Sequence, residues 1–303
     1  MKNKNILIAG GTGFIGGYLT EKLRSDGYRV SILTRSANKR MADTSYRWEP
    51  SIGFIDPEAL NNQNVIINLS GAGITDKLWT RKRKKVILES RVSSTRLLVE
   101  SLRTLRSGPN LFINASAIGY YGNRPGEILT EGSAKGEGFL SDVCYKWEES
   151  VKRMGKLEIP FAIIRMGIVL GKNGGSLRKL MLPLHFGLKV IFGNGKQPVP
   201  WIHIDDVFNI ICGLIKGKLS AGIYNGVAPE SISMEDFTNM MARSLQKRYL
   251  KIRFPERVLK FILGELATVF TDYQKIVTER LPEEKFEYRY PNLENALQDL
   301  LRK

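Results

Sequence analysis

A glycine-rich turn close to the N-terminus constrains the fold of this chain more than any other feature. Residues 6–16 read I-L-I-A-G-G-T-G-F-I-G, so a short apolar run stops at a glycine cluster and a helical apolar periodicity starts at once. This pattern predicts a buried strand that turns directly into a helix over 15–26. Gly10 would allow the tight turn, Gly13 the approach of a diphosphate, and Gly16 close packing of the helix against the strand.

The start of that helix favours a negatively charged ligand, because its first N–H groups are unsatisfied and its dipole is positive there. The spacing G-x-x-G-x-x-G is a weak signal alone. Here it has the required context, with a strand before it and a helix after it, at the start of a βαβ pattern. The sequence therefore predicts a dinucleotide-binding turn, and a purely structural glycine turn is the alternative.

Strands and helices alternate along most of the chain, which predicts a parallel sheet covered by helices on both faces. The expected fold is α/β, a doubly wound parallel sheet of the Rossmann type. Further strands are expected at 28–34, 46–48, 65–69, 111–116, 160–165 and 222–225, and further helices at 80–104, 139–154 and from 204 onward.

The alternating pattern is lost over 171–203, and the tail from Ser233 is mostly helical. We therefore expect two domains. Residues 1–170 and about 204–225 would form the dinucleotide-binding domain, and 171–203 with 226–303 a smaller, mostly helical C-terminal substrate domain.

The composition is that of an ordinary globular protein, with 43% apolar and 25% charged residues in a chain of 303. Two distant cysteines, Cys144 and Cys212, indicate a reducing compartment without disulfides. Two histidines and no clustered carboxylates predict no metal site. No apolar run reaches about 18 residues and the N-terminus lacks a convincing cleavage site, so we expect a cytoplasmic protein without a membrane partner.

The formal net charge of +16 raises the question of whether the protein binds nucleic acid. The densest basic cluster, 81–85, lies in a segment with helical spacing, where a solvated helix face is the commoner explanation. No helix-turn-helix, zinc-finger or aromatic-interleaved signature accompanies it. We therefore expect no nucleic-acid partner, while the excess charge should favour anionic ligands in general.

The residue that ends the second predicted strand indicates which nicotinamide cofactor is bound. An acidic residue there would accept hydrogen bonds from the free ribose hydroxyl of NAD, whereas an arginine favours the 2′-phosphate of NADP. This strand ends in Thr34-Arg35, and no acid follows until Asp43. A guanidinium matches phosphate in a bidentate geometry, so the sequence predicts NADP(H), with a solvated Arg35 as the alternative.

Several motifs together resemble the short-chain dehydrogenase/reductases of the extended type, and most closely their atypical branch called the epimerase family. The resemblance covers the whole chain, including a C-terminal region typical of the branch. The motifs that carry it are G-G-T-G-F-I-G (10–16), T-R (34–35), N-L-S-G (68–71), S-R-V-S-S-T-R-L-L-V (90–99), S-A-I-G-Y-Y-G (116–122), K-W-E (146–148), R-M-G-I-V-L-G-K-N-G-G (165–175), P-W-I-H-I-D-D (200–206), L-G-E (263–265) and Y-P-N-L-E-N-A-L (290–297).

The resemblance implies a set of NADP-binding residues. Leu69 and Ser70 would line the adenosine side, Arg91 would reach the cofactor, and Val169 would lie near the nicotinamide. Core packing is the alternative for Leu69 and Val169, and an ordinary surface cation for Arg91. The complete implied set is Gly10, Thr12, Gly13, Phe14, Ile15, Thr34, Arg35, Leu69, Ser70, Arg91 and Val169.

The usual chemistry of the superfamily needs a Tyr-x-x-x-Lys pair, in which the lysine helps to lower the pKa of the phenol. The chain has this spacing only at Tyr18 and Lys22, on the first helix and in the wrong place. Aligning Glu148 with the family's usual glutamate puts Leu140 and Cys144 at the two positions, and neither can do this work. The absence of this pair is what the resemblance to the atypical branch implies, and it leaves open which reaction the protein catalyses.

Other residues could carry chemistry instead. Ser116 ends a strand close to the position of the family's catalytic serine, and Tyr121 follows it, so a phenol of lowered pKa there could donate a proton. An aromatic pair packed on the loop is the alternative. His203 could act with Asp205, but a hinge histidine is the commoner case, with Asp205 or Asp206 capping a helix that starts near residue 207.

Two functions remain open from the sequence. The first is an NADP-dependent oxidoreductase or nucleotide-sugar epimerase acting on a small-molecule substrate, nucleotide-linked or not. The second is a non-enzymatic NADP(H)-binding regulatory or interaction protein, because fold alone does not determine function. A homodimer is compatible with either.

Overall fold

The computed structural model describes residues 4–35, 45–172, 174–245 and 248–301. Within them one sheet of eight strands has the order β12-β8-β6-β5-β1-β2-β3-β4. All neighbouring pairs are parallel except β3 and β4. Its strands are β1 (Asn5–Ala9), β2 (Arg29–Thr34), β3 (Ser45–Glu49), β4 (Phe54–Ile55), β5 (Val65–Asn68), β6 (Leu111–Ala117), β8 (Phe161–Met166) and β12 (Gly222–Gly226).

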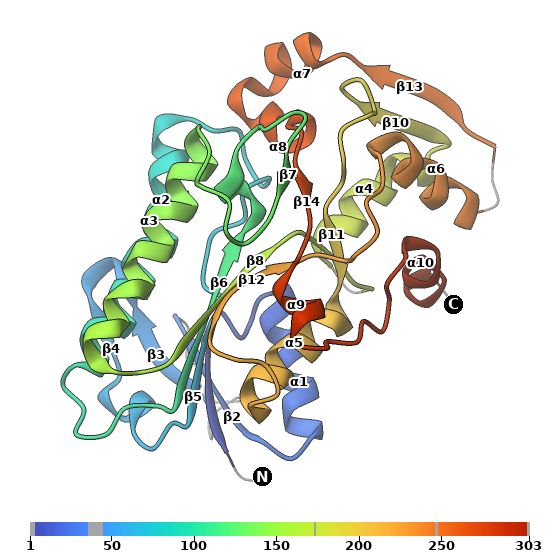
Figure 1. The fold of residues 1–303 in the computed structure, drawn as a ribbon. Coiled ribbons are helices and arrows are strands. Elements are labelled where there is room, and N and C mark those ends of the chain that lie inside the picture. Colours follow the sequence, from blue (N-terminus) through green and yellow to red (C-terminus); the bar gives the residue numbers. More distant parts are fainter. Residues whose placement is uncertain (1–3, 36–44, 173, 246–247, 302–303) are drawn as a thin grey trace.

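Helices cover both faces of this sheet, as Figure 1 shows. Helices α1 (Phe14–Ser25) and α5 (Ile204–Lys216) lie on one face, and α2 (Arg81–Leu102) and α3 (Phe139–Lys152) on the other. Successive side chains of a strand point to opposite faces, so alternate residues of β1 enter different cores. Ile6 and Ile8 pack with α1 and α5, whereas Leu7 packs with α2. The predicted doubly wound α/β fold is confirmed.

A second hydrophobic core lies beside the sheet and contains residues from 170–201 and 228–301. Helices α4 (Gly175–His185), α6 (Met234–Ser244) and α10 (Leu293–Leu301) supply most of it. Paired short strands accompany them: β9 (Ile168–Leu170) with β11 (Trp201–His203), β10 (Leu188–Phe192) with β13 (Leu250–Phe254), and β7 (Ile128–Leu129) with β14 (Lys275–Ile276).

The remaining helices are short. They are α7 (Glu256–Leu263), α8 (Thr268–Thr271), α9 (Arg280–Glu283) and the 3₁₀ turns η2 (Pro50–Ile52), η3 (Pro57–Leu60), η4 (Ile118–Tyr121), η5 (Arg153–Leu157) and η6 (Gly264–Ala267). The C-terminal region is thus mostly helical, as expected. The proposed division into two domains stays a prediction.

Every strand expected for the main sheet is found, and the long helices begin and end within a few residues of their expected bounds. The short strand pairs outside the sheet were not expected. They have two to five residues each, too few to show a hydrophobic period. None of the helices within the described residues is both long and apolar enough to cross a membrane.

Candidate functional site

The glycine turn between β1 and α1 has the geometry expected for it. Gly10 has a φ of +82°, and a Cβ built there would lie 2.9 Å from the backbone C and O of Leu69. A Cβ on Gly16 would lie 2.1 Å from the carbonyl oxygen of Gly10. Side chains at these positions would collide with backbone, so the tight turn and the close packing of helix on strand both require glycine.

The helix that follows this turn begins without a capping side chain. Its N-cap residue is Gly13, no side chain accepts a hydrogen bond there, and the first turn carries no acidic residue. Thr12 and Gly13 are exposed, while Phe14 and Ile15 are half-buried. The start of α1 is therefore an accessible group of backbone N–H donors at the carboxyl edge of the sheet, which suits an anion.

Residues that follow β5 lie against the glycine turn. The amide of Leu69 donates a 2.9 Å hydrogen bond to Ala9 O. The Ser70 hydroxyl is buried and bonds to Ser94 and to Asn68, whose amide donates to Asn114 Oδ1 at 2.7 Å. This buried polar network fixes the end of β5 beside Gly10. The Ser70 side chain is occupied within the protein, so its backbone is the part left for a ligand.

Arg91 of α2 points at the loop after β5. Its Nη1 donates to Ala72 O at 3.0 Å and to Ile87 O at 3.1 Å, and its Cζ lies 5.2 Å from the ring of Trp147. Burial lowers the pKa of Arg91. The side chain is half-buried, so it is not the ordinary surface cation that was the alternative reading.

A second glycine-rich loop packs against the ring of Phe14, the first residue of α1. Cβ atoms built on Gly171, Gly174 and Gly175 would lie 2.7, 2.9 and 2.5 Å from ring carbons of Phe14. The loop follows β9, where Val169 is buried and pairs with Ile202. The structure therefore brings the segments around Gly10, Leu69 and Val169 together, although they lie far apart in the sequence.

Thr34 ends β2, the strand next to β1, and Arg35 follows it directly. Thr34 is half-buried and Arg35 is exposed. Residues 36–44, which include Asp43, lie outside the described residues. Arg35 is therefore at the edge where the predicted site lies, one strand from the glycine turn.

The described residues around the end of β6 do not offer a tyrosine–lysine pair. A Cβ on Gly119, in η4, would lie 3.1 Å from Leu140 Cβ and 3.7 Å from Cys144 Sγ. These two α3 residues therefore face the segment that leaves β6. Burial raises the pKa of the Cys144 thiol to about 12, so it stays protonated at neutral pH.

Ser116 and Tyr121 belong to one buried network around an ion pair. Ser116 Oγ donates to Glu148 Oε1 at 2.6 Å, and Arg165 meets both oxygens of Glu148 at 2.9 and 2.8 Å. Arg165 also donates to the Tyr121 hydroxyl at 2.9 Å, which itself donates to Asn225 Oδ1 at 2.6 Å. Burial lowers the pKa of Arg165, but the hydrogen bonds and charge of Glu148 outweigh it and raise the pKa above its usual value.

Tyr121 does not have the lowered pKa that proton donation was expected to require. The side chain is fully buried, and that burial raises the pKa of its phenol to about 12, against the opposing effect of Arg165. Its ring meets Tyr120 edge-on with centroids 5.4 Å apart, which fits the packed aromatic pair. Catalytic roles for Ser116 and Tyr121 stay predictions.

The cap of α5 differs from the expectation. The helix begins at Ile204 with His203 as its N-cap, and His203 Nδ1 accepts a 3.1 Å hydrogen bond from the Asp205 amide. Asp206 accepts instead from the backbone amides of Arg289 and Tyr290, at 2.7 and 3.0 Å. The prediction that Asp205 or Asp206 caps this helix was wrong, because the Asp206 carboxylate is hydrogen-bonded to the distant backbone at residues 289 and 290.

Asp205 connects α5 to two other parts of the chain. It accepts a hydrogen bond from the Tyr18 hydroxyl of α1, and its second oxygen lies 3.0 Å from Arg289 Nη1. Burial raises the pKa of Asp205, opposed by the charge of Arg289. These bonds occupy the carboxylate, so a catalytic dyad with His203 is not formed.

Stability should fall in acid because of His203. Burial lowers its pKa to about 4 from an ordinary value of 6.5. As the pH falls from 6.5 to 4, the unfolded chain takes up a proton that the folded chain does not, so folding loses up to about 3 kcal/mol. We expect urea unfolding between pH 7 and 4 to show this loss, and His203→Asn, which keeps a capping side chain, to reduce it. Parallel pH profiles for the two proteins would contradict it.

The basic cluster at the start of α2 is divided between solvent and protein. Arg81, Lys82 and Lys85 are exposed, as a solvated helix face requires. Arg83 instead donates to Gly73 O, and Lys84 pairs with Glu265.

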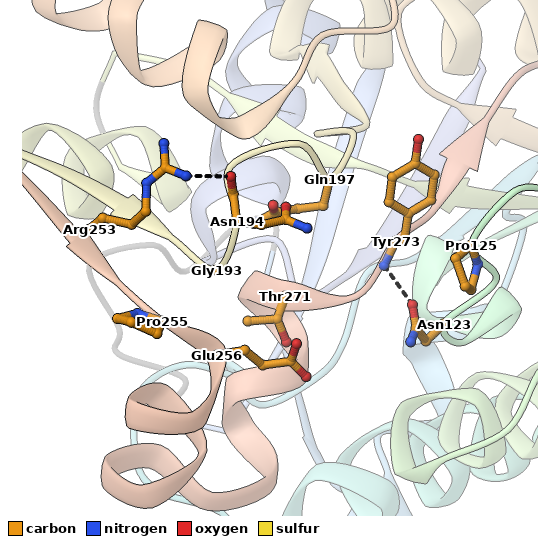
Figure 2. A pocket seen from close by; sticks show the side chains of 10 residues that line it. All are labelled: Asn123, Pro125, Gly193, Asn194, Gln197, Arg253, Pro255, Glu256, Thr271 and Tyr273. Atoms are coloured by element: carbon orange, nitrogen blue, oxygen red, sulfur yellow. Dashed lines mark hydrogen bonds between the residues drawn. The ribbon is translucent and has the colours of Figure 1, made fainter.

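A pocket of 510 Å³ opens between the end of β10, the end of β13 and the segment after η4, as Figure 2 shows. Sequence reasoning did not find it, since its walls come from four distant segments. The residues that line it are Asn123, Pro125, Gly193, Asn194, Gln197, Arg253, Pro255, Glu256, Thr271 and Tyr273. No group of three or more metal-ligating side chains occurs among the described residues.

Comparison with known proteins identifies the family. A model of the NAD dependent epimerase/dehydratase family matches residues 6–225, which is most of the chain. This chain belongs to that family. A second model, for a domain of unknown function (DUF1731), matches residues 254–300, so the C-terminal region expected for this branch of the family is present.

Relatives match along the whole chain. The epimerase family protein SAR0825 of Staphylococcus aureus is 32% identical over an aligned length of 311 residues. The alignment covers 99% of this chain and 100% of the relative. The human epimerase family protein SDR39U1, crystallised with NADPH, has a TM-score of 0.87 at 28% identity and covers 98% of both chains. The nucleoside-diphosphate sugar epimerase of Corynebacterium glutamicum has a TM-score of 0.80 at 28% identity, over 99% of this chain and 58% of that chain.

Proposed function

We propose that this family member binds NADP(H) at the carboxyl edge of its sheet and exchanges hydride between the cofactor and a small-molecule substrate. The observation that carries the proposal is the turn at Gly10–Phe14. It presents an uncapped helix start, with exposed Thr12 and Gly13 and no acidic side chain in the first turn. A pyrophosphate needs this combination of bare amides and close backbone approach.

The implied NADP-binding residues fit this proposal by their positions. The glycine turn would hold the diphosphate, Arg35 the 2′-phosphate, and the backbone at Leu69 and Ser70 the adenosine side. Arg91 would contribute a cation from α2, and Val169 would lie toward the nicotinamide. NADP(H), when bound, supplies the hydride, while the protein orients the reactants. The human relative crystallised with NADPH supports the choice of cofactor.

Reduction suits this site better than epimerisation through an alcohol. Oxidation of an alcohol carbon, the first half of such an epimerisation, requires a base to take the hydroxyl proton. Leu140 and Cys144 occupy the two α3 positions where the tyrosine–lysine pair of the superfamily is expected. They face the segment after β6, and neither provides a base. The same pair would return the proton in a reduction, so its loss weighs on both reactions. It weighs more on a nucleotide-sugar epimerase, which needs two proton transfers where a reductase needs one.

The same two residues favour a second candidate function. A chain that keeps the dinucleotide turn but has lost the acid–base pair could hold NADP(H) as a ligand and act as a regulatory or interaction protein. In either function we expect a reducing compartment such as the cytoplasm, because Cys144 and Cys212 are buried and unpaired.

Turnover distinguishes the two functions. We expect the protein to bind NADPH and to oxidise it slowly with at least one member of a panel of carbonyl compounds and nucleotide sugars. Ser116→Ala should reduce turnover at least about tenfold without changing NADPH affinity, since one hydrogen-bond donor to the reacting oxygen typically contributes about 10²–10³-fold. Tight NADPH binding without turnover on any panel member would favour the regulatory function, and no NADPH binding would refute both.

A further inference from the structure

We propose that the outer edge of β13 binds an extended segment of another protein in which acidic and apolar residues alternate. The segment would add to β10 and β13 as a third strand, antiparallel to β13. This inference goes beyond the proposed function, because it gives the protein a macromolecular partner and uses none of the residues assigned to the cofactor.

The edge of β13 is open. Within the described residues β13 pairs with β10 alone, and Figure 1 shows it on the outer side of β10. The Leu250 amide donates to Gly187 O at 2.9 Å, which directs the backbone groups of Leu250 toward β10. Successive residues of a strand direct these groups to opposite edges, so the N–H and C=O groups of Lys251 and Arg253 point outward. Such unpaired groups can hydrogen-bond to a further strand.

The side chains on one face of this edge carry excess positive charge. Lys251 and Arg253 both pair with Glu235 of α6, and the bond from Arg253 is 2.7 Å long. One carboxylate therefore serves two cations, whose side chains remain 47% and 43% exposed. Arg248, shortly before the strand, is exposed as well. An acidic side chain of an added strand would lie directly opposite each cation of β13 and pair with it.

The side chains on the other face of the edge are apolar. Leu250 is 67% exposed, and its hydrogen bond to Gly187 places it next to Phe186, which is 75% exposed. Leu182, one turn earlier at the end of α4, is also exposed, and Ile252 is half-buried. Contiguous exposed apolar side chains mark interaction sites. The two faces together predict a ligand strand with acidic residues on one side and apolar residues on the other.

A second copy of this chain fits the edge less well. Two β13 strands paired antiparallel about Ile252 would place Lys251 opposite Arg253 of the partner subunit. Like charges directly opposite each other destabilise a strand pair, and basic residues on edge strands commonly prevent self-pairing. The same charges that oppose a second copy favour an acidic strand.

Peptide binding to the full-length protein tests the proposal. The probe is the fluorescein-labelled peptide S-V-E-V-E-V-S with blocked ends, observed by fluorescence anisotropy. The salt concentration is about 150 mM, at which charges more than about 8 Å apart are largely screened. The control peptide S-E-E-V-V-V-S has the same composition without the alternation. We expect the alternating peptide to bind at least about tenfold more tightly than the control, because only it can pair both cations and keep its valines on one face.

Modified peptides report whether the ligand pairs as a strand. In the antiparallel register the two glutamates lie opposite Lys251 and Arg253, so their N–H groups face β13. N-methylation of both glutamates should weaken binding at least about tenfold, since two hydrogen bonds are lost, whereas N-methylation of the central valine should have little effect. In hydrogen exchange followed by NMR, the unmodified peptide should slow exchange of the Lys251 and Arg253 amides.

A charge exchange assigns the binding to β13. Lys251→Glu should weaken binding of the glutamate peptide about tenfold and strengthen binding of its lysine counterpart, S-V-K-V-K-V-S. Lys146→Glu, at an exposed residue of α3, changes the net charge equally and is the matched control. The melting temperatures of both variants check their folding.

Several results would overturn the inference. They are equal binding of the alternating and control peptides, equal affinity of the two N-methylated peptides, and a loss with Lys251→Glu no larger than with Lys146→Glu. Self-association of the wild type that Lys251→Glu strengthens would assign the edge to a second copy instead. None of these measurements involves NADPH, so the proposed function stands or falls separately.

Discussion

Replacing Arg165 with methionine is expected to lower the free energy of unfolding by about 3–5 kcal/mol. The guanidinium is 3% exposed and meets both oxygens of Glu148, which is 1% exposed. Without it, the Glu148 carboxylate would remain buried with only the Ser116 hydroxyl as a hydrogen-bond partner. Urea denaturation at pH 7, followed by circular dichroism, measures the loss.

The double variant Glu148→Leu, Arg165→Met separates the loss of the pair from the cost of the remaining charge. It should lose less stability than Arg165→Met alone, because no unpaired carboxylate stays buried. NADPH affinity should change little in either variant, since neither residue is among the proposed cofactor contacts. A single variant within about 1 kcal/mol of the wild type would show that the pair contributes little.

Arg35→Asp should weaken NADPH binding about 100-fold, which corresponds to about 2.7 kcal/mol. The change removes a guanidinium proposed to pair with the 2′-phosphate and places a negative charge at the end of β2. NADH lacks that phosphate, so its affinity should stay the same or rise. Calorimetric titration with both reduced cofactors measures the shift in preference.

Arg29→Asp is the matched control for this prediction. Arg29 is exposed and starts the same strand, so it lies at the opposite edge of the sheet. The substitution changes the net charge equally, and any general electrostatic effect on an anionic ligand appears in both variants. Equal losses of NADPH affinity in the two proteins would show that Arg35 acts only through the overall field.

Local patterns accounted for much of the part of the fold where we propose that the cofactor binds. The packing at Gly16 depends on Gly10, six residues away, so glycine spacing and apolar periodicity were sufficient there. At Gly10 they predicted the turn, although the backbone that crowds it, at Leu69, lies far along the chain. Local patterns were also sufficient for the central strands β1, β5, β6 and β8, whose buried runs are nearly continuous. The family resemblance, carried by motifs along the whole chain, supplied Leu69 and Val169, which no local pattern would single out.

Long-range pairing was not predictable from the sequence. Glu148 and Arg165 both occur in motifs that had been recognised, yet nothing local indicates that they pair. An acidic residue on the buried face of α3 and a basic residue in an apolar strand were the available signals. The predicted cap of α5 was wrong for a similar reason. Asp206 accepts hydrogen bonds from the backbone amides of residues 289 and 290, which lie far along the chain. The pocket around Gln197 also depends on contacts between distant segments.

The bonds of Asp205 and Asp206 have a consequence for how the chain reaches its native state on the ribosome. Tyr18 emerges early, but its partner Asp205 is translated much later, and Arg289 and the backbone that Asp206 accepts from come later still. Helix α1 therefore gains the last of these surrounding contacts only when nearly the whole chain has been synthesised. Ribosome-bound intermediates that stop before residue 289 should leave this helix more open to proteases than the released protein does.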